Sequence, residues 1–290
     1  MIQKGHWWMT KRSWNKRSFS TTTEREPSPS ASSENLVSWH LDEATKVGTI
    51  TLNSPKTFNA LTVEMGQSFQ ALVRNLQQDA LRDPTAPLHA IVLQGAGDQA
   101  FSAGGNFPWL KSLKDNPVHI NVDHMLDFYN SLLCIRTLDV PTIAALSGPA
   151  MGAGACLALA CDMRVAKQDA PAVLGFPFSR LGIHSGMGGS WLLQHAGISK
   201  AMMHEILFTA KTLSATEAYE LGLVNRTAEN AKEGAQQLAN EVSRQHPVAI
   251  RTMVRTMRGF DEGLQSTLQR EAYAQGMFYV LILPICLKRF

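Results

Sequence analysis

Cysteine is scarce in this chain of 290 residues, and its four cysteines follow no pairing pattern. Cys134, Cys156, Cys161 and Cys286 include no Cys-x-x-Cys pair, so the sequence offers no sign of a disulfide framework. The nine histidines show no metal-ligand spacing. We therefore expect reduced thiols, mostly in the core, and no metal site.

An excess of one charge and a long apolar run are also missing. Lys and Arg number 27 against 24 Asp and Glu, and this net charge of +3 gives no case for a nucleic-acid partner. The apolar run at 279–287 contains Pro284 and is too short to span a membrane. We treat 280–290 as an atypical apolar tail. A truncated or mis-spliced end is the favoured interpretation, and a contact with a membrane or a partner is the alternative.

Acidic residues are absent from residues 1–23, which contain five basic ones: Lys4, Lys11, Arg12, Lys16 and Arg17. Serine and threonine cluster at 18–23, and this composition is typical of a mitochondrial transit peptide. A plastid address and a disordered basic tail are the alternatives. Residues 24–35 are rich in proline and serine, which favours a disordered linker. We therefore expect the folded part over 36–279 and a location in the mitochondrial matrix.

The remaining chain alternates predicted strands and helices. Apolar patterns predict strands at 36–41, 47–52, 89–94, 142–146 and 162–166. Helical spacing predicts an amphipathic helix after Thr62, a second one around Met125–Ile135 and a series of helices over 188–279. With 44% hydrophobic residues the chain can bury a sizeable core. The order of these elements predicts an α/β core that is capped by helices.

The segment SGPAMGAGACLALACD at 147–162 joins a stretch of small residues to the start of a predicted helix. Such a bare backbone lets a ligand approach closely, and the first N–H groups of the helix carry the positive end of its dipole. The segment FSAGGN at 101–106 can offer a further N–H to the same oxygen. Together they favour a site for an anion or a developing oxyanion. Close packing alone is the plainer explanation of either segment.

Three further motifs flank these segments: VGTITLNSPKTFNAL (47–61), LGIHSGMGGSWLL (181–193) and TAKTLSATEAYELGLVN (209–225). With them the chain resembles the crotonase superfamily, also called the enoyl-CoA hydratase/isomerase family, over about residues 36–279. The resemblance implies a ββα-spiral core with a C-terminal helical region. It also implies an acyl-CoA substrate, a homotrimer or hexamer, and no cofactor beyond the coenzyme A that the substrate carries.

By this resemblance, the main-chain N–H groups of Gly105 and Ala153 form an oxyanion hole that polarises the thioester carbonyl and stabilises an enolate. The coenzyme A would lie along the loops at 55–61 and 101–106, with a lysine close to a phosphate. The residues expected to hold it are Lys56, Phe58, Ala60, Ser102, Ala103 and Asn106.

Two positions depart from the family pattern. Hydratases of the family place one glutamate in the helix after the glycine turn, where this chain has Cys156. They place a second glutamate before a Leu-Gly pair, where this chain has Phe178. A thiol and a phenyl ring cannot replace the paired carboxylates that add water across a double bond. The ordinary hydratase and isomerase mechanisms are therefore in doubt.

His184 is the nearby candidate for an acid or base, because its ordinary pKa lies close to neutrality. A structural role at the start of the following helix is the favoured alternative. Cys156 stands near a helix N-terminus, which favours a thiolate. Its favoured interpretation is nevertheless a small core residue.

Three functions remain open. The first is a lyase or isomerase-like enzyme that stabilises an enolate of an acyl-CoA, with a decarboxylase- or hydrolase-like reaction favoured over hydration. The second is an enoyl-CoA hydratase or isomerase of fatty-acid or amino-acid catabolism whose carboxylate has been displaced. The third is a non-catalytic acyl-CoA-binding subunit.

Overall fold

The first two strands pair as an antiparallel hairpin in the computed structural model, which describes residues 35–82, 88–259 and 262–282. They are β1 (Val37–Asp42) and β2 (Val47–Leu52). Lys46 closes the turn with a φ of 56°, and its N–H donates to Asp42 O at 2.7 Å. The Asp42 carboxylate accepts from Ala44 N at 2.9 Å. The two strands predicted at 36–41 and 47–52 are thus confirmed.

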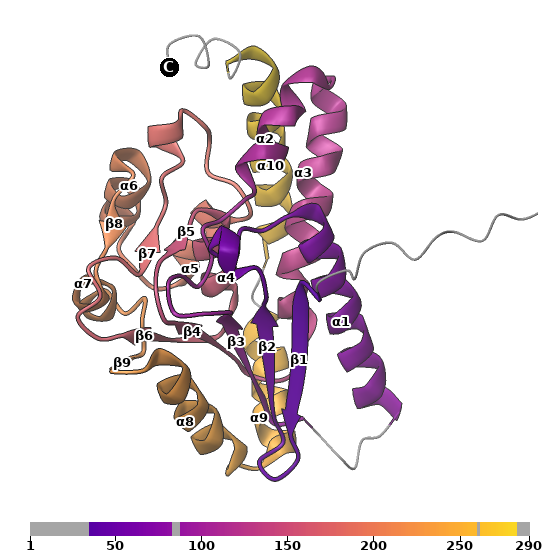
Figure 1. The fold of residues 1–290 in the computed structure, drawn as a ribbon, viewed down its shortest axis with the longest axis vertical. Coiled ribbons are helices and arrows are strands. Elements are labelled where there is room, and N and C mark those ends of the chain that lie inside the picture. The colour runs from indigo at the N-terminus through magenta and orange to yellow at the C-terminus, as the bar shows by residue number, and fades with distance from the viewer. Residues whose placement is uncertain (1–34, 83–87, 260–261, 283–290) are drawn as a thin grey trace, which may run out of the picture. The chain divides into compact units, whose positions relative to one another are not determined.

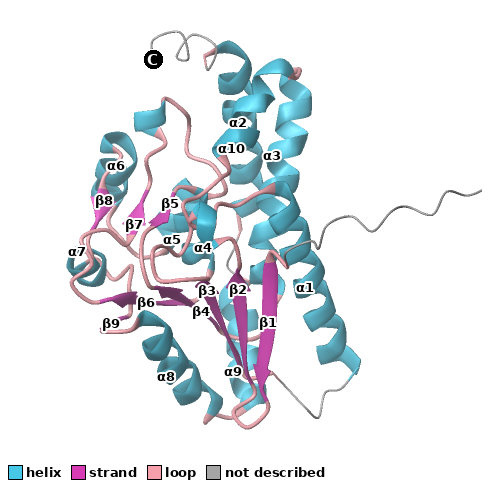
Figure 2. Ribbon diagram, viewed as in Figure 1, coloured by secondary structure: helices cyan, strands magenta, loops and turns pink. Residues whose placement is uncertain are grey.

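Parallel strands continue from this hairpin. They are β3 (Ala90–Gly95), β4 (Thr142–Leu146), β6 (Met163–Lys167) and β9 (Arg226–Ala228), and the sheet order is β1-β2-β3-β4-β6-β9 (Figures 1 and 2). Every residue of β4 is buried, as expected for a strand that is covered on both faces. Helix α8 (Ala231–Ser243) covers one face, where Leu238 packs in one cluster with Val92 and Val165.

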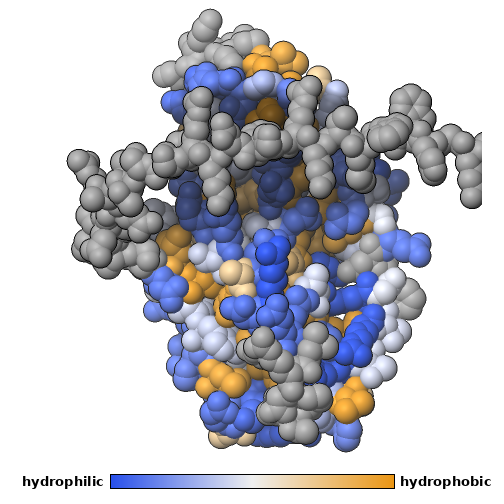
Figure 3. Space-filling model, turned by 90° about the vertical axis from the view of Figure 1, so that its right-hand side faces the viewer, coloured by the Kyte–Doolittle hydropathy of each residue, from blue (hydrophilic) through white to orange (hydrophobic). Residues whose placement is uncertain are grey.

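Two helices cover the other face of this sheet. Their buried side chains form one hydrophobic core with the side chains of that face. Helix α1 (Val63–Arg82) begins after Thr62, whose Oγ1 accepts from Met65 N at 3.1 Å. Met65, Phe69 and Val73 are buried in the core, as the helical spacing predicts. Helix α3 (Val118–Leu133) packs beside α1. The face shown in Figure 3 carries hydrophobic residues scattered among hydrophilic ones, as expected for an outer surface.

A second, three-stranded sheet was not expected. It has the order β5-β7-β8 and consists of β5 (Ala150–Met151), β7 (Leu174–Gly175) and β8 (Thr212–Leu213). Two-residue strands are too short to show the alternation that identifies a strand in a sequence. Helix α2 (Phe107–Ser112) was also missed, although Asn106 caps it by accepting from Trp109 N at 3.0 Å.

The other helices follow the predicted order closely. They are α4 (Ala153–Ala160), α5 (Gly189–His195), α6 (Lys200–Thr209), α7 (Ala215–Glu220), α9 (Pro247–Arg258) and α10 (Leu264–Leu281). Single 3-10 turns occur at η1 (Pro55–Thr57), η2 (Leu113–Asp115), η3 (Cys134–Thr137) and η4 (Ser179–Leu181).

Helix α10 extends beyond the predicted end of the helical series. It begins after Gly263, which has a φ of 89°, and it continues past residue 279 to Leu281. Tyr279 is buried, so the apolar run at 279–287 begins inside the folded core. No helix in the described ranges is both long enough and apolar enough to cross a bilayer.

A buried carboxylate fastens α10 to α5. Glu271 is 1% exposed, and it accepts hydrogen bonds from Gly188 N at 2.7 Å, Ser190 N at 3.2 Å and Ser190 Oγ at 2.7 Å. These N–H groups stand at the start of α5, where backbone donors lack partners within the helix and the dipole favours a negative charge. The C-terminal helix is thus fixed to the core by charge-assisted bonds.

Several predictions from the sequence lie outside the described residues. They are the transit peptide at 1–23, the linker up to residue 34, the tail from 283 to 290 and Cys286 within that tail.

Glu271→Ala should destabilise the fold by about 2–4 kcal/mol, because it leaves the buried N–H of Gly188 and the part-buried N–H and hydroxyl of Ser190 without their acceptor. Urea unfolding measures this change. Glu241→Ala is the matched control, since Glu241 is exposed and pairs with exposed Arg226, and it should move the midpoint little. Equal midpoints for the two variants would contradict the role given to Glu271.

Candidate active site

Two loops from different parts of the chain pass each other within hydrogen-bonding distance. Ser102 pairs with Ala150 in an isolated parallel bridge, and Met151 N donates to Ser102 O at 2.9 Å. A Cβ added to Gly154 would lie 2.6 Å from Ser102 O, closer than real contacts allow. Only glycine therefore permits this approach, which joins the two segments that the sequence singled out.

Asn59 holds the first of these loops in place. It is fully buried with a φ of 54°, and its Oδ1 accepts from Ser54 N at 3.0 Å. Its Nδ2 donates to Ala96 O at 3.0 Å and to Ala100 O at 3.1 Å. Sequence reasoning missed this residue. The available signal was an asparagine in a loop, a residue type that tolerates positive φ and bonds to nearby backbone.

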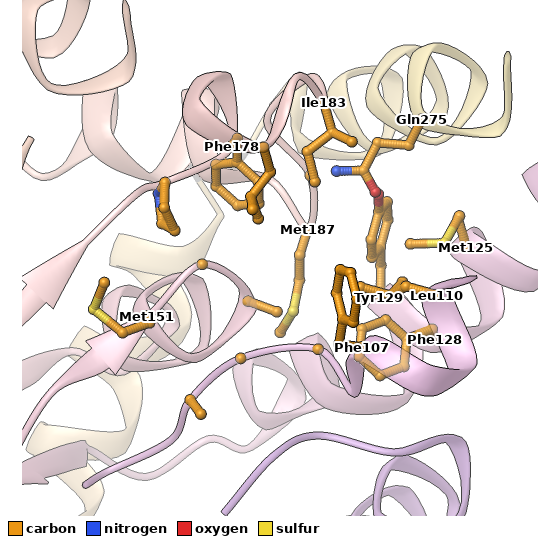
Figure 4. Close-up of a pocket in the computed structure, with 18 of the residues that line it drawn as sticks. Phe107, Leu110, Met125, Phe128, Tyr129, Met151, Phe178, Ile183, Met187 and Gln275 are labelled. Atoms are coloured by element: carbon orange, nitrogen blue, oxygen red, sulfur yellow. The ribbon is translucent and has the colours of Figure 1, made fainter. Parts of the chain in front are cut away.

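A cavity of about 200 Å³ opens beside the two loops (Figure 4). Its wall is predominantly apolar, and the described lining residues include no charged side chain. Side chains from α2, α3, β5, α10 and the segment 177–187 surround it. The largest of them belong to Phe107, Leu110, Met125, Phe128, Tyr129, Met151, Phe178, Leu181, Ile183, Met187, Gln275 and Tyr279.

Gly105 and Ala153 both line this cavity. Ala153 is the first residue of α4, and neither its N–H nor that of Gly105 donates to an acceptor within the described residues. The backbone also brings the two loops together at this point, because a Cβ added to Gly104 would lie 3.5 Å from Ala153 N. Two unpaired main-chain donors therefore border one cavity.

Apolar side chains flank these two donors. A Cβ added to Gly105 would lie 3.2 Å from Leu110 Cδ1, and one added to Gly152 would lie 3.8 Å from Phe178 Cε1. Figure 4 shows the Phe178 ring at the cavity wall. Leu110 and Phe178 both line the cavity that these donors border, so hydrocarbon side chains stand close to the donors.

Cys156 lies behind this wall rather than in it. It is fully buried in α4, and its Sγ donates to Gly186 O at 3.4 Å. Burial, followed by the charge of Glu271, raises the pKa of the thiol well above its usual value. The favoured interpretation of Cys156 as a small core residue agrees with this burial, because desolvation disfavours the thiolate that a helix N-terminus would favour.

The polar groups of the cavity wall are neutral. Tyr129 Oη donates to Gln275 Oε1 at 2.7 Å, and burial raises the pKa of Tyr129 well above its usual value. Burial also raises the pKa of Tyr279, whose hydroxyl has no partner within the described residues. Glu271 stands nearby on α10, but it does not line the cavity and its carboxylate is occupied at the start of α5.

His184 is not brought to the cavity. Its side chain is exposed and its Nδ1 lies 2.7 Å from Ser185 O, whereas the lining on this segment comes from Ile183, Gly186 and Met187. The main chain of His184 does serve the site, since its carbonyl accepts from Gln275 Nε2 at 2.7 Å.

The six residues expected along coenzyme A divide into two groups. Lys56, Phe58 and Ala103 are exposed, and Ala60 is half-buried in the same loop as Lys56. Ala103 N donates to Phe58 O at 2.8 Å, so the two loops share one edge. The side chains of Ser102 and Asn106 instead bond to Asn59 O and to Trp109 N, respectively, and thereby shape the loop.

Comparison with known proteins places this chain in a family. The family model for enoyl-CoA hydratase/isomerase matches residues 42–282. A short-chain-enoyl-CoA hydratase of Clostridium acetobutylicum is 30% identical over 240 residues, which cover 81% of this chain and 87% of that protein. The human enoyl-CoA hydratase domain-containing protein 2, mitochondrial, is 30% identical over 241 residues, which cover 81% and 77%.

Solved structures agree with these relatives. An enoyl-CoA hydratase/isomerase from Mycobacterium paratuberculosis matches with a TM-score of 0.76 and 26% identity, covering 89% of this chain and 100% of that one. The crotonase-type α/β fold predicted from the sequence is thus confirmed. The chain belongs to the enoyl-CoA hydratase/isomerase family, a family of acyl-CoA-processing enzymes.

Proposed function

We propose that this protein binds an acyl-CoA thioester with its carbonyl oxygen on the N–H groups of Gly105 and Ala153. The observation that carries the proposal is the pair of unpaired main-chain donors beside one apolar cavity. The start of α4 adds the positive end of its dipole. Donors of this kind stabilise the negative charge that develops on the thioester oxygen when an enolate forms.

The coenzyme A moiety is proposed to lie along the shared edge of the loops at 55–61 and 101–106. Exposed Lys56 is available there as a point charge for a phosphate, and exposed Phe58 offers a flat apolar surface. Main chain around Ala60, Ser102, Ala103 and Asn106 completes the proposed edge. No cofactor is proposed other than the coenzyme A that the substrate itself carries.

Decarboxylation of a malonyl-type CoA is the reaction that this cavity suits best. The bond from the α-carbon to the carboxylate breaks, carbon dioxide leaves, and the electron pair remains as an enolate on the thioester oxygen. Water then returns a proton to the α-carbon. Leu110 and Phe178 support this choice, because an apolar wall disfavours the charged carboxylate and accepts neutral carbon dioxide.

Hydrolysis of the thioester is the related possibility, since the same donors would hold its tetrahedral oxyanion. A hydratase or isomerase reaction needs a carboxylate that reaches the substrate, and the described lining residues offer none. That same lack supports the third candidate, a subunit that binds acyl-CoA without turning it over.

Ala153→Pro should lower turnover by about 10²–10³-fold, because it removes one of the two donors. The first turn of a helix tolerates proline, so α4 should still form. Turnover is measured with the acyl-CoA that the unmodified protein converts fastest, and far-ultraviolet circular dichroism checks the fold. Ala153→Gly is the matched control because it keeps the N–H. Unchanged turnover in the proline variant would refute the oxyanion hole.

Hydration of crotonyl-CoA by the unmodified protein should be far below about 10 s⁻¹, the median for enzymes. Missing an acid and a base costs roughly 10²–10⁴-fold per group. A malonyl-type CoA and a hydroxyacyl-CoA are assayed in parallel, and release of carbon dioxide from the former is expected. Hydration above that rate would show that a displaced carboxylate acts. Binding of all three without turnover would instead favour the non-catalytic subunit.

We further propose a homotrimer or hexamer in the mitochondrial matrix, with a plastid as the alternative address. Relatives from human and Arabidopsis thaliana are named as mitochondrial proteins, which supports this location. The full chain fused to a fluorescent protein at its C-terminus should co-localise with a matrix marker.

The proposed assembly is tested separately. Light scattering should give the mass of three or six copies, and a monomeric mass would refute the assembly.

A further inference from the structure

The cavity is open at one end and closed at the other. Phe107 and Leu181 line it and are 56% and 53% exposed, so they mark its mouth. Tyr129 and Gln275 line it and are 1% and 3% exposed, so they mark its closed end. In Figure 4 this pair stands across the cavity from Met151 and Phe178.

The closed end is held by bonds from three separate segments. Tyr129 from α3 donates to Gln275 from α10, and Gln275 in turn donates to the carbonyl of His184 at 2.7 Å. The next loop residues pack directly on the pair, since a Cβ added to Gly186 would lie 2.4 Å from Gln275 Nε2 and 2.6 Å from Tyr129 Oη. Nothing larger than glycine fits there, so Gly186 packs tightly against the pair and forms part of the same cavity wall.

Helix α10 cannot easily withdraw from this position. One turn before Gln275, Glu271 is bound to Gly188 and Ser190 at the start of α5. Two consecutive turns of α10 are therefore tied to the segment 184–190. A cavity wall fixed at both turns keeps its volume when a ligand enters, because interiors of this density do not yield continuously.

The volume of the cavity and the lack of charge in its wall define which chemical groups it can bind. A protein cavity of 150 Å³ holds benzene, with six carbon atoms, so about 200 Å³ accommodates roughly eight. The absence of a charged side chain among the described lining residues makes a second charged group at the closed end costly. An uncharged hydrocarbon chain matches both limits.

We propose that the Tyr129–Gln275 pair is the floor of the acyl site and restricts the substrate to short and medium acyl groups of up to about eight carbon atoms, uncharged at the far end. The inference rests on the proposed function, in which the acyl group of a CoA thioester enters this cavity. A carboxylate on the α-carbon lies at the other end, beside Phe178, and is unaffected by the floor.

A series of S-alkyl-CoA thioethers from butyl to dodecyl tests the floor by isothermal titration calorimetry. Thioethers have no carbonyl and are not turned over, so their affinity reports the cavity independently of the oxyanion hole. Affinity should rise about fourfold per methylene, as expected for buried hydrocarbon, up to about eight carbons. It should stay level or fall beyond that length. A continued rise to dodecyl in the unmodified protein would overturn the proposal.

Variants of Tyr129 test whether this residue sets the chain length at which affinity stops rising. Tyr129→Ala removes the ring from the floor and should move the break in affinity to chains about four carbons longer. Tyr129→Leu is a smaller change that should move it in the same direction if the alanine variant fails to fold. Tyr129→Phe keeps the ring and should keep the break. Tyr219→Ala, a change at an exposed tyrosine on α7, is the matched control. An unmoved break in folded Tyr129→Ala or Tyr129→Leu would refute the floor.

The two proposals fail separately. A break near eight carbons combined with full turnover in Ala153→Pro leaves the floor and removes the oxyanion hole. An affinity that is independent of chain length, combined with lost turnover in Ala153→Pro, removes the floor and leaves the oxyanion hole.

Discussion

The site depends on one close approach, that of the loop at Ser102 to the loop at Ala150–Gly154. A side chain at Gly154 would collide with Ser102 O, so the contact exists only because this position is bare. The approach sets two main-chain donors, at Gly105 and Ala153, on a common cavity. Both donors are main-chain N–H groups, so they do not depend on a functional side chain. Their strength comes instead from being fixed before any substrate arrives.

An apolar surrounding changes what such donors can do. In a cavity without charged side chains among its described lining, the local dielectric is low and each dipole acts more strongly than in water. Burial keeps both Tyr129 and Cys156 in their neutral forms. The main-chain dipoles are therefore the chief electrostatic feature that a substrate meets. Chemistry that develops charge on one oxygen and releases a neutral fragment fits this environment better than chemistry that moves protons between carboxylates.

Sequence patterns predicted the parts of this arrangement that are local. The spacing of Met65, Phe69 and Val73 identifies the core face of α1, and glycine-rich segments identify the two loops. Long-range polar contacts could not be predicted in this way. Asn59 and Glu271 are ordinary residues for a loop and a helix, and they become important only through partners 41 and 83 residues away. No periodicity records such a partner, because the contact is made by the tertiary fold.

The donors and the floor of the cavity come from different parts of the chain. Gly105 stands on the loop between β3 and α2 and Ala153 stands at the start of α4, whereas Tyr129 and Gln275 stand on α3 and α10. Glu271 ties α10 to α5 rather than to the loops that carry the donors. A substitution on α10 can therefore alter the room for the acyl chain while the donors keep their positions. The kind of reaction and the range of acyl groups are then separable properties of one cavity, each set by its own rigid elements.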